Sequence, residues 1–447
     1  MQKLSMVEKV GFGAGDMALN VVISSMMLII TFFYTDIYGL HTEDLALLFL
    51  AVKVIGAVAD LVMGQITDRF TNRCGRYRPW LLFLAVPYGV SVFFVFSTPD
   101  WSYDAKMIWA YSTYILMTLM TAGVGIPYIS LISALTSDPQ DRLSANGYRL
   151  FFAKIGAFMV TIIVPLLAKE WGGGNPAVGY QAAMAVMALM GVVLFLFCFF
   201  STEERVHHVV QRQPLLDQLK VLLKNDQWLI LCGACVTGTI GYVVRGSVAM
   251  YYAKYYLGGD EAVVSAFLST GVAAAILSMV ASTWITKSYC KVKLFRNSQV
   301  VVAAISLAIY LFVKPGDVVL AFVLYFLLSF IVDLHAPVFW SAIAETIDYG
   351  QVKTGTRVSG FAFGGISVCQ KAGMGIAGAL VGLLLTHFQY QPNVAQTPLA
   401  LTGIALMLTV IPGFFHLVMG LLMFRYRISD EYYGAVKAKM LTHGYAA

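Results

Sequence analysis

Long apolar stretches alternate with short polar ones along almost the whole chain. About twelve of these stretches are long enough for a helix to cross the hydrocarbon core of a bilayer, which takes roughly 20 residues. They lie near residues 10–34, 43–66, 80–98, 107–133, 149–168, 178–200, 228–257, 262–286, 294–313, 318–342, 358–386 and 398–424. The pattern predicts an all-α membrane protein with about twelve transmembrane helices.

The longest polar interruption lies near the middle of the chain and divides the apolar segments into two equal sets. Two six-helix halves joined by a linker are the plan of the major facilitator fold, in which a central site is exposed alternately to either side of the membrane. We therefore expect an N-terminal bundle at 1–200, a cytoplasmic linker at 201–227, a C-terminal bundle at 228–425 and a cytoplasmic tail at 426–447.

Lys and Arg are concentrated in alternate loops. The loops after the second, sixth and eighth apolar segments carry Arg69, Arg73, Arg76, Arg78, Arg205, Arg212, Lys220, Lys224, Lys287, Lys291, Lys293 and Arg296. By the positive-inside rule these loops and both termini are cytoplasmic. The net charge of +6 is then mainly an orientation signal, and we expect no nucleic-acid partner.

Composition and motifs exclude several other classes. Hydrophobic residues make up 59% of the chain and charged residues 12%, about half the charged fraction of soluble domains. The first apolar segment opens with glycines and Asp16, unlike the core of a cleavable signal peptide. The chain lacks a GxxxxGK[ST], a HExxH and a GxSxG, and its cysteines are scattered. We therefore expect no catalytic residue, no metal site and no cofactor.

Two charges interrupt the second apolar segment. A charged side chain at the bilayer centre costs roughly 2.5–3.5 kcal/mol, so such residues usually face a bundle interior or a solute pathway. Lys53 and Asp60 are about two helical turns apart and share one helix face with Gly56. This face predicts a coupling or solute site. The alternative is a permanent Asp60–Lys53 ion pair that only holds the helix against its neighbours.

A second pair of polar residues falls within the tenth apolar segment. Asp333 and His335 lie near its middle, where a carboxylate beside an imidazole could relay protons. We therefore add Asp333 to the candidates for cation coupling. The alternative for His335 is a hydrogen-bonded helix contact, with Pro337 causing a local break.

Six short motifs are distributed along the chain. They are Gly11-Phe-Gly-Ala-Gly-Asp16, Tyr34-Thr-Asp36, Gly75-Arg-Tyr-Arg-Pro-Trp80, Ile126-Pro-Tyr128, Lys224-Asn-Asp-Gln227 and Asp348-Tyr-Gly-Gln-Val-Lys-Thr-Gly355. Together they resemble the glycoside-pentoside-hexuronide:cation symporters, the family of the melibiose permease, although Gln351 stands where that family usually has Glu. The resemblance implies a monomeric multi-pass transporter in the bacterial inner membrane, with a small-molecule sugar as substrate and the lipid bilayer around it.

The resemblance also bears on the coupling ion. Sodium-coupled members have an oxygen cage, and here Gly56 replaces its first acid, Ala59 its amide and Ala122 its Thr. Asp60 remains, and Lys53 stands in place of an Arg. Sodium needs several oxygen ligands, whereas a proton needs one titratable group. The resemblance therefore favours coupling to H⁺ over Na⁺.

The family's solute site implies a further set of residues here. These are Asn20, Arg149, Trp340 and Lys371, with hydroxyls from Tyr114 and Tyr128. Sugars are held by hydrogen-bonding side chains and by an aromatic face against the ring, and Trp340 could supply that face. Neutral residues, Asn20 and Gly125, correspond to the two sugar-binding acids of the melibiose permease.

The neutral residues at these two positions leave an excess of positive charge at the expected solute site. Lys53, Arg149 and Lys371 stand against one firm anion, Asp60, unless Asp16, Asp333 or Glu345 neutralises the excess. Lys and Arg are the usual partners of carboxylate and sulfonate groups. We therefore expect proton-coupled symport of an acidic sugar, a hexuronide or a sulfonated sugar. The alternatives are a sodium-coupled symporter of a neutral glycoside or pentoside, an uncoupled facilitator or lipid-type carrier, and a sensor or channel.

Overall fold

The computed structural model describes residues 4–69, 72, 75–136, 139–205, 215–356, 358 and 360–442. Part of the predicted linker and of the predicted tail lies outside these residues, as do Arg73 and Arg212. The described residues fold mainly into helices, of which 12 stretches are long and apolar enough to cross a membrane. This confirms the predicted fold class, while the exact domain boundaries stay a prediction.

The helices follow one another in two sets. The first set comprises α1 (Met6–Leu28), α2 (Ile30–Phe32), the π-helix η1 (Phe33–Ile37), α3 (Thr42–Arg69), α4 (Arg78–Val95), α5 (Tyr103–Leu135), α6 (Pro139–Gly172) and α7 (Pro176–Ser201). The second set comprises α8 (Leu215–Leu223), α9 (Asp226–Tyr251), the π-helix η2 (Tyr252–Tyr256), α10 (Glu261–Ile285), α11 (Lys291–Phe312), α12 (Val318–Asp333), α13 (Ala336–Thr354), α14 (Gly360–His387), α15 (Pro398–Leu408), α16 (Val410–Leu422) and α17 (Asp430–Thr442).

Polar residues mark where several helices begin. Ser5 and Glu8 form a capping box at the start of α1, in which the Glu8 N–H donates to the Ser5 hydroxyl at 3.2 Å. Asn225 caps α9 and Asp260 caps α10 in the same way. These side chains satisfy N–H groups that a helix cannot pair internally. They fix the helix starts at the two ends of the molecule.

The tenth predicted segment is not one continuous helix. It is divided into α12 and α13, with Leu334 and His335 at the break. Pro337 has no N–H, so it cannot donate to the carbonyl of Asp333 four residues earlier. Asp333 therefore lies at a helix end, where the sequence predicted mid-helix.

The two halves share a local irregularity. The first membrane-spanning stretch of each half ends in a π-helical turn, η1 after α1 and α2, and η2 after α9. Single π-helical turns are rare and frequently occur at functional sites. Both turns carry tyrosines and charged residues, including Asp36 and Lys254.

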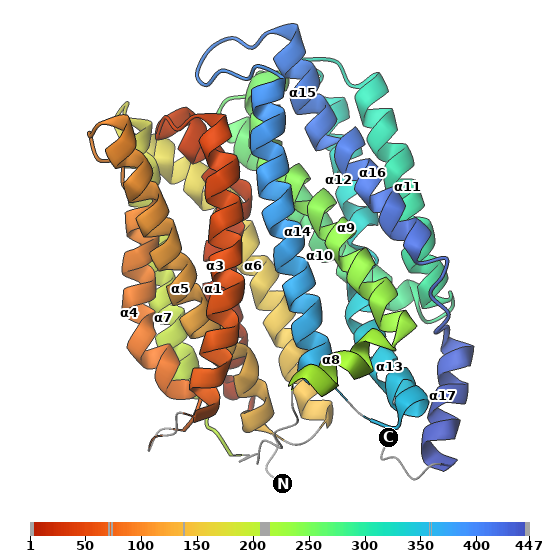
Figure 1. Ribbon diagram of the computed structural model, residues 1–447. Helices are drawn as coiled ribbons and strands as arrows, with labels where there is room; N and C mark the ends of the chain where they lie inside the picture. Colours follow the sequence, from red (N-terminus) through yellow and green to blue (C-terminus); the bar gives the residue numbers. More distant parts are fainter. Residues whose placement is uncertain are drawn as a thin grey trace.

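Both chain ends lie at the same face of the bundle (Figure 1). We call it the terminal face, and the opposite one the distal face. The halves meet along two lines of helix packing, α3 against α14 and α6 against α10, and α1 also contacts α9. Figure 1 shows α3 and α14 side by side at the centre of the molecule. Residues on these helices can therefore build a site between the halves.

Candidate functional site

A cavity of about 330 Å³ lies between the two halves. Its walls come from α1, α3 and α5 in the first half and from α9 and α14 in the second. Buried Phe49 and Tyr114 line it on the distal side, and exposed Ile129 and Ser367 line it toward the terminal face. The exposed part of the cavity lining thus lies toward the terminal face. Most of the remaining lining is apolar, including Met26, Met27, Met117 and Met374.

An ion pair between the halves lies in this cavity. Lys371 on α14 pairs with the carboxylate of Asp60 on α3, and its ammonium lies 3.4 Å from the Gly56 carbonyl oxygen. The two side chains are 30% and 21% exposed. A half-buried pair of this kind is screened less by water than a surface pair. The sequence interpretation that Asp60 pairs permanently with Lys53 is wrong, because the partner of Asp60 comes from the opposite half.

Small residues on α14 make this pairing possible. A Cβ placed on Gly375 would lie 3.2 Å from the Cβ of Lys53, and one on Gly378 would lie 2.8 Å from the Cβ of Phe49. Glycine therefore allows the two backbones to approach closely at these positions. Lys371 lies one helical turn before Gly375, so this close packing brings its ammonium to Asp60.

Lys53 adds a second positive charge to the same cavity. Its side chain lines the wall, and it forms no ion pair or hydrogen bond with any other described residue. It also lies within electrostatic range of Lys371. The charged side chains that line the cavity are thus Lys53, Lys371 and Asp60. This arrangement leaves an excess of one positive charge.

Arg149 does not contribute to this excess. Its Nε lies 3.3 Å from Oδ2 of Asp16 within the same half. Asn20 is held nearby, where its amide donates to the Asp16 carbonyl at 2.9 Å. Neither Arg149 nor Asn20 lines the central cavity. The sequence count of three cations against one anion therefore becomes two against one at the cavity itself.

The three aromatic candidates have different surroundings. Tyr114 lines the cavity. Tyr128 is fully buried, stacks on Phe12 with ring centroids 5.0 Å apart, and donates to the Phe12 carbonyl at 2.6 Å. Trp340 on α13 is 43% exposed and is not part of the cavity wall. In this conformation only Tyr114 can contact a solute in the cavity.

Asp333 belongs to a separate group of charges. It lies within electrostatic range of Lys154 on α6 and Arg245 on α9. Arg245 is 4% exposed. His335 is engaged locally, with its Nδ1 2.5 Å from the Val332 carbonyl oxygen. Asp333 is therefore not part of the cavity wall that carries Asp60 and Lys53, the other two candidates for cation coupling.

Asp60 is the only carboxylate among the described residues that line the cavity. Gly56 and Ala122 line the cavity without a polar side chain. Thr118 and Thr121 also line it, and their hydroxyls donate to carbonyls of their own helix at 2.8 Å, which leaves their oxygen lone pairs available. Sodium requires several oxygen ligands to replace its water. Protonation of Asp60 requires only the carboxylate.

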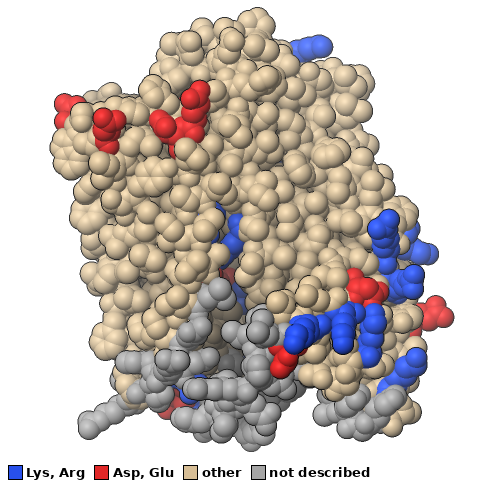
Figure 2. Space-filling view, in the orientation of Figure 1, with Lys and Arg blue, Asp and Glu red and all other residues tan. Residues whose placement is uncertain are grey.

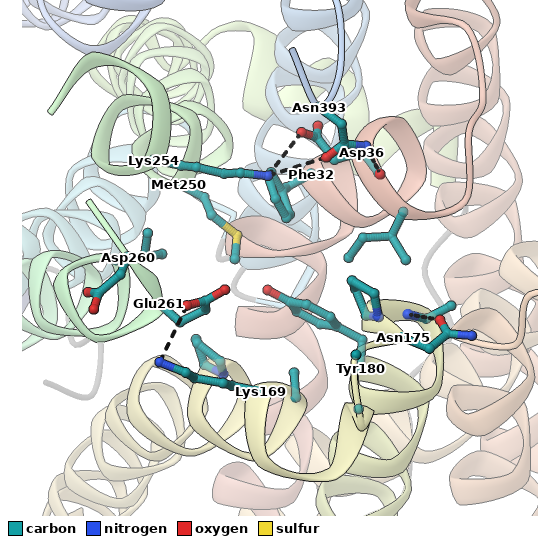
Figure 3. A pocket seen from close by; sticks show the side chains of 18 of the residues that line it. Phe32, Asp36, Lys169, Asn175, Tyr180, Met250, Lys254, Asp260, Glu261 and Asn393 are labelled. Atoms are coloured by element: carbon teal, nitrogen blue, oxygen red, sulfur yellow. Dashed lines mark hydrogen bonds and ion pairs between the residues drawn. The ribbon is translucent and has the colours of Figure 1, made fainter. Parts of the chain in front are cut away.

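The halves are also joined near the distal face by Asp36 of η1. Its buried carboxylate accepts hydrogen bonds from the hydroxyls of Tyr390, at 2.6 Å, and Tyr255, and its Oδ1 lies 3.6 Å from Nζ of Lys254. The Asn393 side chain donates to the Asp36 backbone carbonyl. We call Asp36 with these four residues the distal gate, of which Figure 3 labels Asp36, Lys254 and Asn393.

The chemistry of the distal gate favours tight closure. Burial, with Tyr251 and Asp36 close by, raises the pKa of Tyr390 well above its usual range. Its hydroxyl therefore stays protonated and able to donate. Farther along the same interface, the hydroxyls of Thr42 and Thr386 lie 2.5 Å apart. These contacts close the space between the halves on the distal side of the central cavity.

The sequence alone assigned no role to Asp36. Its motif, Tyr34-Thr-Asp36, was recognisable, but every gate partner lies in the opposite half of the chain. The one local signal was a charged residue at the end of an apolar segment. Such residues are common at membrane interfaces and do not by themselves indicate a gate.

Comparison with known families agrees with this architecture. A sequence model of the family described as MFS/sugar transport protein matches residues 11–430. The chain is 34% identical to the inner membrane symporter YicJ of Escherichia coli (strain K12), over 95% of this chain and 92% of that protein. It is 33% identical to the putative glycoside/cation symporter YagG of the same organism, over 99% of this chain and 96% of that protein.

A more distant relative and a solved structure extend the comparison. The glucuronide carrier protein homolog of Escherichia coli (strain K12) is 27% identical, over 96% of this chain and 95% of that protein. A solved structure of a bacterial homologue of the human drug peptide transporters PepT1 and PepT2 matches with a TM-score of 0.69, at 12% identity, over 94% of this chain and 98% of that one. At this identity the structural match shows the fold alone.

Proposed function

Because this chain belongs to the MFS/sugar transport protein family, as a membrane transporter of the glycoside-pentoside-hexuronide:cation symporter type and not an enzyme, we propose that it carries an acidic sugar together with a proton. Sugar symport agrees with the names of its relatives, a glycoside/cation symporter and a glucuronide carrier homolog. The central cavity supports the narrower choice of an acidic sugar.

The charge balance of the cavity is the observation that carries the proposal. Lys53 and Lys371 face one carboxylate, Asp60. When Asp60 is ionised, its carboxylate forms an ion pair with the ammonium of Lys371. When Asp60 is protonated, the ammonium of Lys371 is released and two cations face the cavity. A carboxylate or sulfonate on the sugar then pairs with them.

This exchange of partners links the proton to the sugar. The proton removes the negative charge of Asp60, and the acidic sugar supplies a negative charge in its place. Protonation of Asp60 alone therefore leaves Lys371 without an anionic partner at the α3–α14 interface, and binding of the acidic sugar supplies one. One proton and one monoanionic sugar together carry no net charge. Transport at this stoichiometry is electroneutral.

We assign the terminal face to the cytoplasm of the bacterial inner membrane. Lys and Arg atoms gather near that face, and basic atoms are also visible in the recess between the halves (Figure 2). An excess of basic residues in short loops marks the cytoplasmic side. The distal face is then external, and the conformation is inward-facing, with the distal gate closed and the cavity accessible from the cytoplasm.

Binding to the purified protein tests the acidic-sugar proposal. The 4-nitrophenyl β-D-glucuronide and β-D-glucoside differ only at C6, where the first has a carboxylate and the second a hydroxymethyl group. We expect the glucuronide to raise the melting temperature more than the glucoside, more strongly at pH 6 than at pH 8, and equally with and without sodium. Stabilisation by the glucoside alone, or only with sodium, would instead favour a neutral glycoside or sodium coupling.

A further inference from the structure

A second cavity, of about 560 Å³, opens between the halves near the distal face. One wall consists of the end of α6, the start of α7 and the loop between them, and the other consists of η2 and the start of α10. Asp36, Lys254 and Asn393 of the distal gate form part of its wall. We call it the distal vestibule (Figure 3).

The vestibule presents polar groups with unused hydrogen-bonding capacity. Tyr180 is 7% exposed, and its hydroxyl points into the open space in Figure 3 without a hydrogen-bond partner among the described residues. Lys169 and Glu261 extend from opposite halves with Nζ and Oε2 3.7 Å apart, longer than a normal hydrogen bond. Each can therefore still bind a third group.

The remaining lining suits a sugar ring. Asn175 and Asn393 also line the vestibule, and Nζ of Lys254 lies over the ring of Phe32, 4.6 Å from its centroid. Several hydroxyls on one pyranose ring require such a mixture of donors, acceptors and apolar surface. The volume falls within the roughly 300–1,000 Å³ that is usual for small-molecule sites.

The charge of the vestibule differs from that of the central cavity. Its carboxylates are Asp36, Asp260 and Glu261, and its ammonium groups are Lys169 and Lys254. The vestibule therefore has no excess of positive charge to select an acidic group. Its contacts suit the ring hydroxyls that acidic and neutral glycosides share.

We propose that the distal vestibule is a second sugar-binding site, which captures the sugar ring by its hydroxyls while the distal gate is closed. The proposal rests on the proposed function for the class of substrate. A sugar in this site competes for Lys169 and Lys254, which otherwise contact Glu261 and Asp36 across the interface between the halves. Capture thereby weakens the contacts that keep the distal side closed, and a substrate promotes opening of its own entrance.

Equilibrium binding to the purified full-length protein tests the proposal with the same two glycosides. We expect two molecules of the glucuronide per wild-type protein. The double variant Asp60→Asn/Lys371→Met should lose the central site and keep one site, which binds the glucuronide and the glucoside with affinities within about threefold. Removing both partners of the ion pair leaves neither of them as an unpaired charge, and Lys53 stays as it is in the wild-type protein.

Substitutions of residues in the vestibule provide a second test of the same site. Tyr180→Phe and Lys169→Gln should each weaken the remaining site at least fivefold in the double-variant background. In wild-type protein they should raise the KM for uptake more than they lower kcat. Lys314→Gln, which changes a lysine of the distal loop between α11 and α12 outside the vestibule, should leave both quantities unchanged.

Each outcome decides between the two proposals. A single glucuronide site that disappears in the double variant would overturn the vestibule site and leave the proposed function intact. Two sites that are both insensitive to Tyr180→Phe and Lys169→Gln would also overturn it. Failure of the wild-type protein to bind either glycoside would overturn both proposals.

Discussion

Lys53 is the residue whose role depends most directly on its lack of a partner among the described residues. It lines the central cavity and forms no ion pair there, whereas Asp60 and Lys371 hold each other. An ammonium in this position attracts an anion, and a hydrogen bond to a charged group is worth about 1.5–3 kcal/mol. The sequence identified Lys53 from its place in an apolar segment, but not its freedom to bind a solute.

Replacing Lys53 tests its contribution to selectivity. Lys53→Met keeps most of the side-chain volume and leaves no carboxylate unpaired. We expect the affinity for 4-nitrophenyl β-D-glucuronide to fall about ten- to a hundredfold, in line with that hydrogen-bond energy, and the affinity for the glucoside to change little. Titration of purified protein with both glycosides measures the two values. An equal loss of affinity for both glycosides would show that Lys53 maintains the shape of the cavity and does not bind the acidic group.

The Asp60–Lys371 pair makes a prediction about stability. Lys371→Met should lower the melting temperature by several degrees, because it leaves the carboxylate of Asp60 half-buried without its cation; breaking a fully buried pair costs about 3–5 kcal/mol. Adding Asp60→Asn should restore most of the loss. Thermal unfolding of the two variants in the same detergent gives the comparison. If the double variant were less stable than Lys371→Met, the pair would not be the source of the effect.

At the scale of helices, the apolar pattern predicted the spans well but not their close packing. Helix positions follow from local hydrophobicity, whereas the pairing of α3 with α14 depends on residues far apart in the chain. The glycines of α14 do not by themselves show which helix packs against them. The break between α12 and α13 was visible only as Pro337, which a kinked helix could equally have accommodated.

Two glycines of α14 provide a matched test of this packing. Gly378→Ala places a Cβ 2.8 Å from that of Phe49, whereas a Cβ on Gly364 meets nothing within 4 Å. We expect Gly378→Ala to slow sugar uptake at least fivefold, because α3 and α14 must separate slightly and the ion pair beside them loosens. Gly364→Ala should transport normally. Equal rates for both variants in a cell uptake assay would mean that the close approach of α3 and α14 is not required.

For the whole molecule, the relative position of the halves follows from contacts that sequence reasoning could not foresee. The motif containing Asp36 was recognised, yet its partners Tyr255, Tyr390 and Asn393 lie in the opposite half. By contrast, the major facilitator fold could be expected from helix number and the central polar interruption alone. Fold class thus depends on patterns within the chain, and conformational state depends on pairs between its halves.

The distal gate predicts how one charge changes the balance between conformations. Asp36→Asn keeps the shape of the side chain but removes the negative charge that Tyr390, Tyr255 and Lys254 share. We expect the distal side to open more often. In a variant carrying Thr42→Cys and Thr386→Cys, whose native hydroxyls lie 2.5 Å apart, disulfide formation should then slow at least threefold. An unchanged rate of disulfide formation would show that the charge of Asp36 does not hold the distal gate closed.

Proton movement accompanying sugar transport tests the central claim most directly. In proteoliposomes containing a pH-sensitive dye, inward flux of the glucuronide should acidify the interior by one proton per sugar, without sodium and without dependence on membrane potential. Asp60→Asn should abolish this acidification while still exchanging internal for external glucuronide, and Asp104→Asn, on the distal face, should behave like wild type. Glucuronide flux without proton movement, or flux that requires a sodium gradient, would contradict the account.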